Sequence, residues 1–396
     1  MLVATSLVML MTPGLAFFYG GLVGRKNVLA IMIQSFVSMG IVDILWFTVG
    51  FSLCFSGGHG GIYGNLDMAF LHGVTPNSEF GDVPGGAHIP MYVFIAYQMM
   101  FAIITPALIS GAFTNRVRFK AYLMFLIGWT LFVYFPFVHM IWGGGLLSTW
   151  KVQDFAGGIV VHAIAGMAAL ATVLFIGRRR VTEPGPHSLP LVALGTGLLW
   201  FGWYGFNAGS ELKVDNITAL AFLNTDLAAS VAAVTWLGMA WIFEKKPKFL
   251  GLLTGAVAGL ATITPCAGYV SPSAAIAIGF LAGTICYAAI WFKNRKQWDD
   301  ALDVWGVHGV GGTIGALSVG VFAWSEMNSG SQNGLLHGGT HLFEAQLAAT
   351  ALAAVWAFTF TYVMLFLIDK ITPVRVSEKG EEEGLDIMEH GERAYI

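Results

Sequence analysis

Long apolar runs separated by short polar connections recur from one end of the chain to the other. Each run contains about 20 residues, which as a helix cross the roughly 30 Å of hydrocarbon in a bilayer, whereas strands of a membrane barrel would alternate apolar and polar residues. The pattern therefore predicts eleven membrane-spanning helices. Their predicted bounds are 1–23, 28–54, 91–113, 121–142, 155–177, 188–207, 217–243, 249–267, 273–292, 302–322 and 342–368.

The composition agrees with a membrane location. Of the 396 residues, 56% are hydrophobic and only 11% are charged, less than half the roughly 25% of an ordinary soluble domain. We therefore expect an all-α polytopic membrane protein, with residues 1–368 as one domain of eleven transmembrane helices and residues 369–396 as a charged tail. The three cysteines, Cys54, Cys266 and Cys286, have no paired spacing and predict neither a disulfide framework nor a zinc site.

Basic residues lie almost entirely on one side of the predicted helices. Because Lys and Arg concentrate on the cytoplasmic side, we expect the tail to be cytoplasmic and the amino terminus to be outside the cell membrane. The first span starts at Met1 without a polar leader, so either the chain is already processed or this helix inserts directly. Of 20 basic residues, only Lys151 and Lys213 fall on the outer side. The inner ones are Arg25, Lys26, Arg116, Arg118, Lys120, Arg178, Arg179, Arg180, Lys245, Lys246, Lys248, Lys293, Arg295, Lys296, Lys370, Arg375, Lys379 and Arg393.

An internal repeat is predicted from motifs that recur five spans apart. The Ile-Thr-Pro sequence at 104–106 in the third span recurs at 263–265 in the eighth, and an Asp/His segment in the fifth span recurs in the tenth. An odd offset inverts the second copy in the membrane. We therefore expect inverted five-helix repeats, spans one to five and six to ten, followed by a C-terminal helix, with a binding site near the midplane.

Two histidines occupy equivalent places in these repeats. His162 and His308 each follow an aspartate by eight residues and precede a glycine, Gly166 or Gly312, by four. An ionised side chain at the bilayer centre costs at least about 3 kcal/mol, so ionisable groups there usually line a path or cavity. We expect the two imidazoles to face each other across the repeat axis.

Two imidazoles side by side in a dry site should be neutral, because desolvation and mutual repulsion both disfavour their charged forms. A proton shared between the rings would give them opposite tautomers and leave one further nitrogen of each ring for the pore. Such a lining can exchange hydrogen bonds with a small polar molecule but offers a permanent ion no counter-charge. The pair therefore favours passage of a neutral molecule.

Asp154 and Asp300 begin the two histidine helices, where each carboxylate can cap the first-turn N–H groups. Asp154 is also expected to shape an outer entrance for cations. An intramembrane metalloenzyme is a weaker alternative, because Asp154 lies about two turns, roughly 12 Å, from His162 along the helix, too far for shared ligation. The histidine-containing loops 55–90 and 323–341 also lack metal-ligand spacing, so we expect no metal and no cofactor.

Five longer motifs carry more specific information. They are Trp142-Gly-Gly-Gly145, Asp154-Phe-Ala-Gly-Gly-Ile-Val-Val-His162, Trp200-Phe-Gly-Trp-Tyr-Gly-Phe-Asn-Ala-Gly-Ser210, Asp303-Val-Trp-Gly-Val-His308-Gly and Gly384-Leu-Asp-Ile-Met-Glu-His-Gly-Glu-Arg-Ala-Tyr395. In this order, and over essentially the whole chain, they resemble the Amt/Mep/Rh ammonium transporter family. The resemblance implies a transporter rather than an enzyme, assembled as a homotrimer with one pore in each subunit.

The resemblance also implies an outer ammonium site made of Phe101, Trp142 and Ser210, with Asp154 as the acidic residue near it. The residue types suit this role. Aromatic faces attract a cation by about 0.5–2 kcal/mol, which recruits the ion without trapping it, and a serine oxygen can accept an N–H bond. Phe101 and Phe206 are implied to stack as a gate beneath the site.

His162 and His308 would be the family's twin pore histidines. An intact ion in a dry pore risks many kcal/mol of Born cost, whereas the pKa of ammonium is about two units above neutral, so deprotonation costs about 3 kcal/mol. We expect ammonium to lose its proton near the gate, to cross as ammonia and to be reprotonated inside. Electroneutral and electrogenic transport both stay open, and two further acidic residues in predicted spans, Asp43 and Asp226, have no assigned place.

The tail could be a solvated end by composition, but Leu385, Ile387, Met388 and Tyr395 interrupt its charge and could dock on the cytoplasmic face. It resembles the family segment that cooperates with PII signalling proteins, which implies a soluble PII partner and no nucleic acid. The main alternative function is an ammonium sensor that uses the same fold to bind rather than conduct. Such a receptor would be expected to carry an appended signalling domain.

Overall fold

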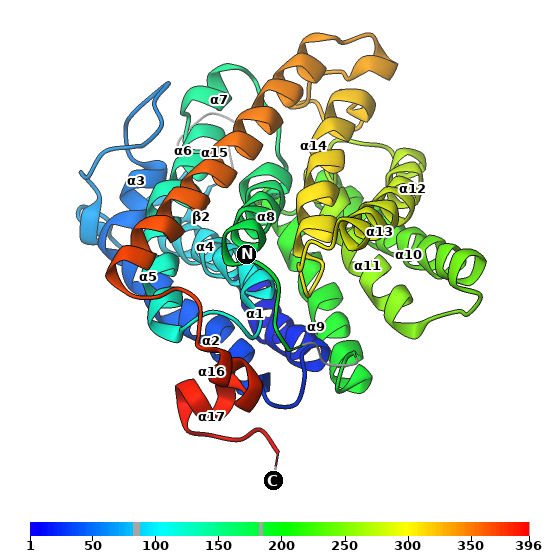
Figure 1. Ribbon diagram of the computed structural model, residues 1–396. Coiled ribbons are helices and arrows are strands. Elements are labelled where there is room, and N and C mark those ends of the chain that lie inside the picture. Colours follow the sequence, from blue (N-terminus) through cyan, green and yellow to red (C-terminus); the bar gives the residue numbers. More distant parts are fainter. Residues whose placement is uncertain (82–87, 182–184, 396) are drawn as a thin grey trace.

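The computed structural model describes residues 1–81, 88–181 and 185–395. Within these ranges the chain is a bundle of helices, and its strands are limited to the antiparallel pair β1 (Glu79–Phe80) and β2 (Ile89–Pro90) (Figure 1). The α-helices are α1 (Leu2–Leu22), α2 (Val28–Leu45), α3 (Phe51–Phe55), α4 (Met91–Phe113), α5 (Phe119–Trp129), α6 (Phe135–Trp142), α7 (Leu146–Thr149), α8 (Ile164–Ile176), α9 (Leu189–Ala208), α10 (Asn216–Glu244), α11 (Phe249–Ile263), α12 (Pro272–Leu281), α13 (Tyr287–Lys296), α14 (Gly311–Phe322), α15 (His341–Ile371), α16 (Glu378–Glu383) and α17 (Leu385–His390).

Ten helical segments of the described chain are long and apolar enough to cross a membrane. They are Leu2–Leu22, Val28–Phe55, Met91–Phe113, Phe119–Thr149, Gly158–Ile176, Leu189–Glu211, Asn216–Glu244, Pro272–Lys296, Trp305–Phe322 and His341–Ile371. Each coincides with one of the predicted spans. The helix in the remaining predicted span, 249–267, is α11, which is apolar but has only 15 residues.

π-Helical turns interrupt several spans that the sequence predicted as continuous helices. They are η1 (Trp46–Gly50), η3 (Thr130–Tyr134), η4 (Gly158–Ala163), η6 (Ala282–Cys286) and η7 (Trp305–Val310). The remaining short turns, η2 (Ala69–Leu71), η5 (Gly209–Glu211) and η8 (Leu335–His337), are 3₁₀-helical. π-Helical turns are rare in proteins overall, and those that occur are often found at functional sites. Here η4 contains His162 and η7 contains His308, so the distortion lies at the residues with candidate chemistry.

The two histidine segments cross inside the bundle. α8 packs against η7 and α14 packs against η4, so each histidine turn meets the helix that follows the other. The crossing is close because Gly166 on α8 and Gly309 on η7 meet backbone to backbone. A Cβ atom on Gly166 would lie 2.0 Å from the Gly309 nitrogen. Small residues at such a crossing allow membrane helices to approach closely.

The tail folds against one end of the bundle as α16 and α17, which lie beside α2 (Figure 1). The Asp386 carboxylate accepts from the backbone N–H groups of Val28 at 3.1 Å and Ala30 at 2.8 Å, so it caps α2. Leu385 is buried. The docking interpretation of the tail is therefore confirmed, and the interpretation as a solvated end is wrong because these contacts join residues that are distant in sequence.

Not all of the apolar residues that could dock are buried. Ile387 and Met388 are 39% and 42% exposed, whereas Leu385 packs with Val376 and Ala30. Tyr395 instead forms a hydrogen bond with the His187 ring at 2.8 Å, and the Arg25 guanidinium lies over its ring at 5.0 Å. Polar and aromatic contacts therefore add to the apolar packing of the tail. Because basic loops gather at this end of the bundle, it is called the basic side below.

Candidate functional site

Phe101, Trp142 and Ser210 line one pocket on the side opposite to the tail. They come from α4, from the end of α6 and from the turn η5 after α9. The Phe101 and Trp142 rings stand edge to face, with centroids 6.0 Å apart. The Ser210 hydroxyl donates to the Phe206 carbonyl at 2.8 Å, which leaves its oxygen able to accept. The rest of the lining is Phe55, Phe80, Phe94, Gln98, Ile141, Phe155 and Leu212. Aromatic walls around a few polar atoms are suited to a small cation.

Phe101 and Phe206 close the bottom of this outer pocket. Their ring centroids are 4.3 Å apart with a 36° tilt, and both side chains are buried. Phe101 lines the outer pocket, whereas Phe206 lines a second, narrow cavity beneath it. The two rings therefore separate the outer pocket from the interior of the bundle.

His162 and His308 lie in this second cavity and contact each other. Their Nδ1 atoms are 3.2 Å apart and their rings are nearly parallel, at 19°. Only 1% and 4% of these residues are exposed. The Nε2 atom of His162 has no hydrogen-bond partner among the described residues. A hydrogen bond between the two Nδ1 atoms needs one donor and one acceptor, so neutral rings would have opposite tautomers. The other walls are mostly apolar, from Met11, Leu15, Phe18, Ile104, Leu108, Val161, Leu199, Trp203, Phe206 and Val257.

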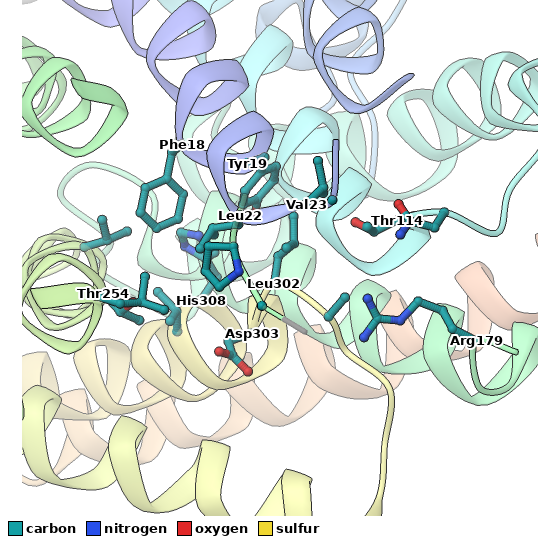
Figure 2. Close-up of a pocket in the computed structure, with 18 residues that line it drawn as sticks. Phe18, Tyr19, Leu22, Val23, Thr114, Arg179, Thr254, Leu302, Asp303 and His308 are labelled. Carbon is teal, nitrogen blue, oxygen red and sulfur yellow. The ribbon is translucent and has the colours of Figure 1, made fainter. Parts of the chain in front are cut away.

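A third cavity, of about 190 Å³, opens on the basic side (Figure 2). It shares Phe18, Val257 and His308 with the histidine cavity, so His308 lies at the boundary between the two. Its lining also includes polar residues, among them Asp303 and Arg179, which Figure 2 places around the pocket. The surroundings therefore change from apolar to polar just beyond the histidine pair.

The charged groups of this inner pocket are neutralised by partners. Asp303 forms an ion pair with the buried Lys293, and Arg179 forms one with Asp299 at 2.7 Å. Burial by itself raises the pKa of Asp299, but hydrogen bonds from Arg179 and the charge of Arg116 bring that pKa below its ordinary value. Burial lowers the pKa of Arg116 to about 10, partly offset by Asp299. The pocket is thus polar without a bare fixed charge at these positions.

A sequence model described as the Ammonium Transporter Family matches residues 1–395. This chain belongs to the ammonium transporter family. Members of this family and the relatives below are transporters, not enzymes.

Curated relatives and solved structures match nearly the whole transporter. It is 43% identical over 392 residues to an ammonium transporter of Bacillus subtilis, covering 98% of this chain and 96% of that protein. It is 42% identical over 397 residues to the ammonium transporter Amt1 of Archaeoglobus fulgidus, covering 100% and 97%. The crystal structure of Candida albicans Mep2 matches with a TM-score of 0.87 at 33% identity, covering 95% of this chain and 85% of that one. A structure described as a Sensor Amt Protein matches with a TM-score of 0.88 at 31% identity, covering 98% and 96%.

Asp154 anchors the His162 turn of the transporter. Its two carboxylate oxygens accept from four consecutive backbone N–H groups, residues 157–160, at 2.6–3.1 Å. The capping interpretation is confirmed, although η4 begins at Gly158, three residues after the predicted start of the span at 155. Because these bonds use both oxygens and only 4% of the residue is exposed, direct contact of the carboxylate with a substrate is not favoured. Its carbonyl oxygen accepts from Trp142 Nε1 at 2.9 Å, which fixes that ring.

Asp300 has a related role at the second histidine turn. One of its carboxylate oxygens accepts from the Trp305 backbone N–H at 2.8 Å. Its carbonyl oxygen accepts from Lys293 Nζ at 2.6 Å. An aspartate therefore holds each of the two histidine turns, but the numbers of bonds are unequal.

Gln98 lines the outer pocket, although the sequence did not identify it as a candidate site residue. Its Oε1 atom is buried and has no hydrogen-bond partner in the described chain. An unpartnered acceptor on the wall of a cation pocket can take an N–H bond from a ligand. The available signal was a glutamine inside an apolar span, one turn before Phe101.

Asp43 and Asp226 line none of these three cavities. Asp226 accepts from Trp200 Nε1 at 3.2 Å and from the Tyr204 hydroxyl at 2.6 Å, so it joins α9 to α10. Asp43 is half-buried on α2. Their positions give no support to a role in the pore of the transporter.

Proposed function

We propose that the transporter recruits NH4+ between Phe101, Trp142 and Ser210, that the ion passes its proton to a water molecule at the Phe101 and Phe206 gate, and that NH3 then moves past His162 and His308. The observation that carries this proposal is the succession of three cavities. Phe101 lines the bottom of the outer pocket, and Phe206, which contacts it, lines the histidine cavity. His308 lines both the histidine cavity and the inner pocket. Reprotonation then occurs in the inner pocket, where the lining becomes polar.

The energetic argument favours ammonia over ammonium as the crossing species. The histidine cavity is narrow, buried and apolar except for the imidazoles, so an ion there would lose its hydration without gaining a counter-charge. Removing the proton costs about 3 kcal/mol at neutral pH. Each ring can then exchange a hydrogen bond with the neutral molecule. In this proposal Asp154 acts by holding the His162 turn and Trp142, rather than as a direct ligand.

We further propose the complete topology predicted from the sequence. The protein crosses the cell membrane eleven times, with α11 as the eighth span. Its amino terminus is outside and its tail is cytoplasmic. Spans 1–5 and 6–10 form inverted repeats. The reciprocal packing of α8 on η7 and of α14 on η4 supports the repeat. The clustering of basic loops with the tail supports the orientation. A homotrimer with one pore per subunit follows from the family resemblance.

A sensor that binds ammonium without conducting it is the second candidate, because a Sensor Amt Protein shares this fold. Purified protein on a solid-supported membrane distinguishes the two after a jump in ammonium concentration. We expect a transport current or, if transport is electroneutral, a change of internal pH. If the protein still binds ammonium but gives neither a current nor a change of internal pH, the result would favour the sensor.

Trp142→Leu should weaken the apparent affinity for ammonium about 2- to 30-fold, because a cation over an aromatic ring gains about 0.5–2 kcal/mol. The measurement is the concentration dependence of the same signal, with thermal unfolding to check the fold. Trp150→Leu is the matched control, since Trp150 is a partly exposed tryptophan that does not line the pocket. Unchanged affinity and cation selectivity in Trp142→Leu would remove the ring from the site.

We propose a PII signalling protein as the soluble partner of the tail. Deleting residues 384–396 removes α17 and its contacts with α2. We expect basal transport to stay measurable and inhibition by added PII protein to be lost or weakened. Inhibition is measured as the decrease of the ammonium signal with increasing PII protein. Lys379→Gln, at an exposed site before the deletion, is the control. Full inhibition of the truncated protein would show that the loops suffice.

A further inference from the structure

Three aromatic side chains of the outer pocket have no role in the proposed transport steps. They are Phe55 at the end of α3, Phe80 in β1 and Phe94 in α4, and together they are called the aromatic collar. Phe94 precedes Phe101 by seven residues, or two helical turns, so both lie on the same face of α4. Phe94 is roughly 10 Å nearer the outer end of that helix. The collar therefore lines the part of the pocket that is farther from the gate.

The collar rings pack against one another. Phe80 and Phe94 stack face to face, with centroids 3.6 Å apart and an angle of 6°, and the Phe55 ring meets Phe94 edge-on at 4.9 Å. The pairing of β1 with β2 holds Phe80, and the Met91 N–H donates to the Ser78 carbonyl at 2.8 Å. Phe80 is thus fixed beside the start of α4, although it comes from the connection between two spans.

The outer pocket has more space and more ring surface than one ammonium ion can use. Its volume is about 260 Å³, whereas a molecule of the size of water takes up about 30 Å³ of the liquid. None of the described residues that line it is charged, and its aromatic residues are Phe55, Phe80, Phe94, Phe101, Trp142 and Phe155.

These walls identify the occupant by its chemistry. The faces of aromatic rings carry negative charge, so they attract cations and repel anions. The unpartnered Gln98 oxygen also favours a positive charge over a neutral apolar molecule. A cation whose surface consists of methyl groups matches the rings best, because aromatic cages are a common recognition site for quaternary ammonium groups.

We propose that the aromatic collar binds methylated ammonium ions that lack an N–H group, and that these ions block the outer pocket. Their methyl groups contact the rings of Phe55, Phe80 and Phe94. Such an ion has no proton to lose, so it stays charged and is stopped at Phe101 and Phe206, whose ring centroids are 4.3 Å apart. The inference rests on the proposed recruitment of ammonium in this pocket, because a block there requires that the two cations compete.

Competition measured with the full chain on a solid-supported membrane tests the collar. Ammonium jumps are recorded in tetramethylammonium chloride and, as the reference, in sodium chloride at the same ionic strength. We expect tetramethylammonium to raise the ammonium concentration that gives the half-maximal signal, without lowering the maximal signal. A jump in tetramethylammonium alone should give neither a current nor a change of internal pH.

Phe80→Leu should weaken inhibition by tetramethylammonium about 2- to 30-fold, the range for loss of one contact between a cation and a ring. Phe55→Leu is a second variant with the same expected direction, and Phe80→Tyr, which keeps the ring, should keep the inhibition. Phe70→Leu is the matched control. Phe70 lies in the same connection between α3 and α4, is 64% exposed and contacts Phe47, but it does not line the pocket. Thermal unfolding checks the fold of each variant.

Equal inhibition of the unmodified protein, Phe80→Leu and Phe55→Leu would overturn the collar as the binding site. An equal loss of inhibition in Phe70→Leu would also overturn it, because the effect would not depend on the lining of the pocket. An ammonium signal that a large excess of tetramethylammonium leaves unchanged, or a current from tetramethylammonium itself, would overturn the block. The proposed recruitment site fails by a different result, an unchanged ammonium affinity in Trp142→Leu, so the two failures are distinguishable.

Discussion

Replacing His162 with aspartate should make the pore permeable to potassium. The variant places a carboxylate where the lining has no fixed charge, inside a cavity with mostly apolar walls. At about 4 Å a carboxylate attracts a cation by about 4 kcal/mol, even at an effective dielectric constant of 20. If only a third of this attraction remains after dehydration of the ion, potassium flux rises about tenfold. Ammonium would no longer need to lose its proton.

His308→Asp should have a similar effect, because the two rings contact each other at Nδ1 and line the same cavity. His162→Asn is the matched control, since it keeps a polar side chain without adding charge and should continue to exclude potassium. A buried carboxylate that becomes protonated loses its attraction, so the potassium flux should increase as the pH rises.

The measurement is the flux of potassium and of ammonium into proteoliposomes, repeated at a series of pH values from acid to alkaline. Exclusion of potassium by both aspartate variants over this range, with ammonium transport intact, would contradict the role of neutral histidines in selectivity. If the aspartate variants lose all transport, His162→Asn shows whether the cause is the added charge or the loss of the histidine pair, because it removes one ring without adding a charge. Ammonium transport by His162→Asn with potassium still excluded would support the proposal.

Gly166→Val should abolish most transport and lower thermal stability. A Cβ atom at Gly166 would lie 2.0 Å and 2.1 Å from the nitrogen and Cα of Gly309. Both neighbours are backbone atoms, so α8 and η7 must separate to admit it. Overpacking a tight core typically costs about 1–3 kcal/mol, and the larger valine should reach or exceed the upper figure. Separation of these segments would also move His308 away from His162.

Gly197→Ala is the control for Gly166→Val and for the milder Gly166→Ala. A Cβ atom on Gly197, in α9, would meet nothing within 4 Å, and alanine is the better helix former. We expect this control to keep its melting temperature and transport rate. Thermal unfolding followed by size-exclusion chromatography, together with ammonium flux, checks the three variants. Normal stability and flux in Gly166→Val would show that the crossing is not tight.

The membrane spans could be predicted from the sequence because their constraint is local. A segment that crosses hydrocarbon must satisfy its own backbone hydrogen bonds and present about 20 apolar residues. α4 was predicted at 91–113 and is found at Met91–Phe113. The proximity of His162 and His308 was also predictable, because the repeated motif supplied a relation between distant segments.

The geometry around these elements required the tertiary structure. The π-helical turns, the four bonds to Asp154 and the backbone contact of Gly166 with Gly309 depend on how neighbouring segments pack. Gln98 gave only a weak signal, because one polar residue in an apolar helix does not reveal which cavity it faces. The tail was ambiguous for the same reason.

The sequence by itself therefore determined the class of protein, ten segments that are long and apolar enough to cross a membrane, and the two histidines that contact each other. Each of these follows from the local balance of apolar and polar groups or from a repeated motif. Only the tertiary structure decided that Asp386 caps α2 and that Asp154 is enclosed by backbone N–H groups. The physical reason is that hydrogen bonds and van der Waals contacts act over a few ångströms between residues that can be hundreds of positions apart.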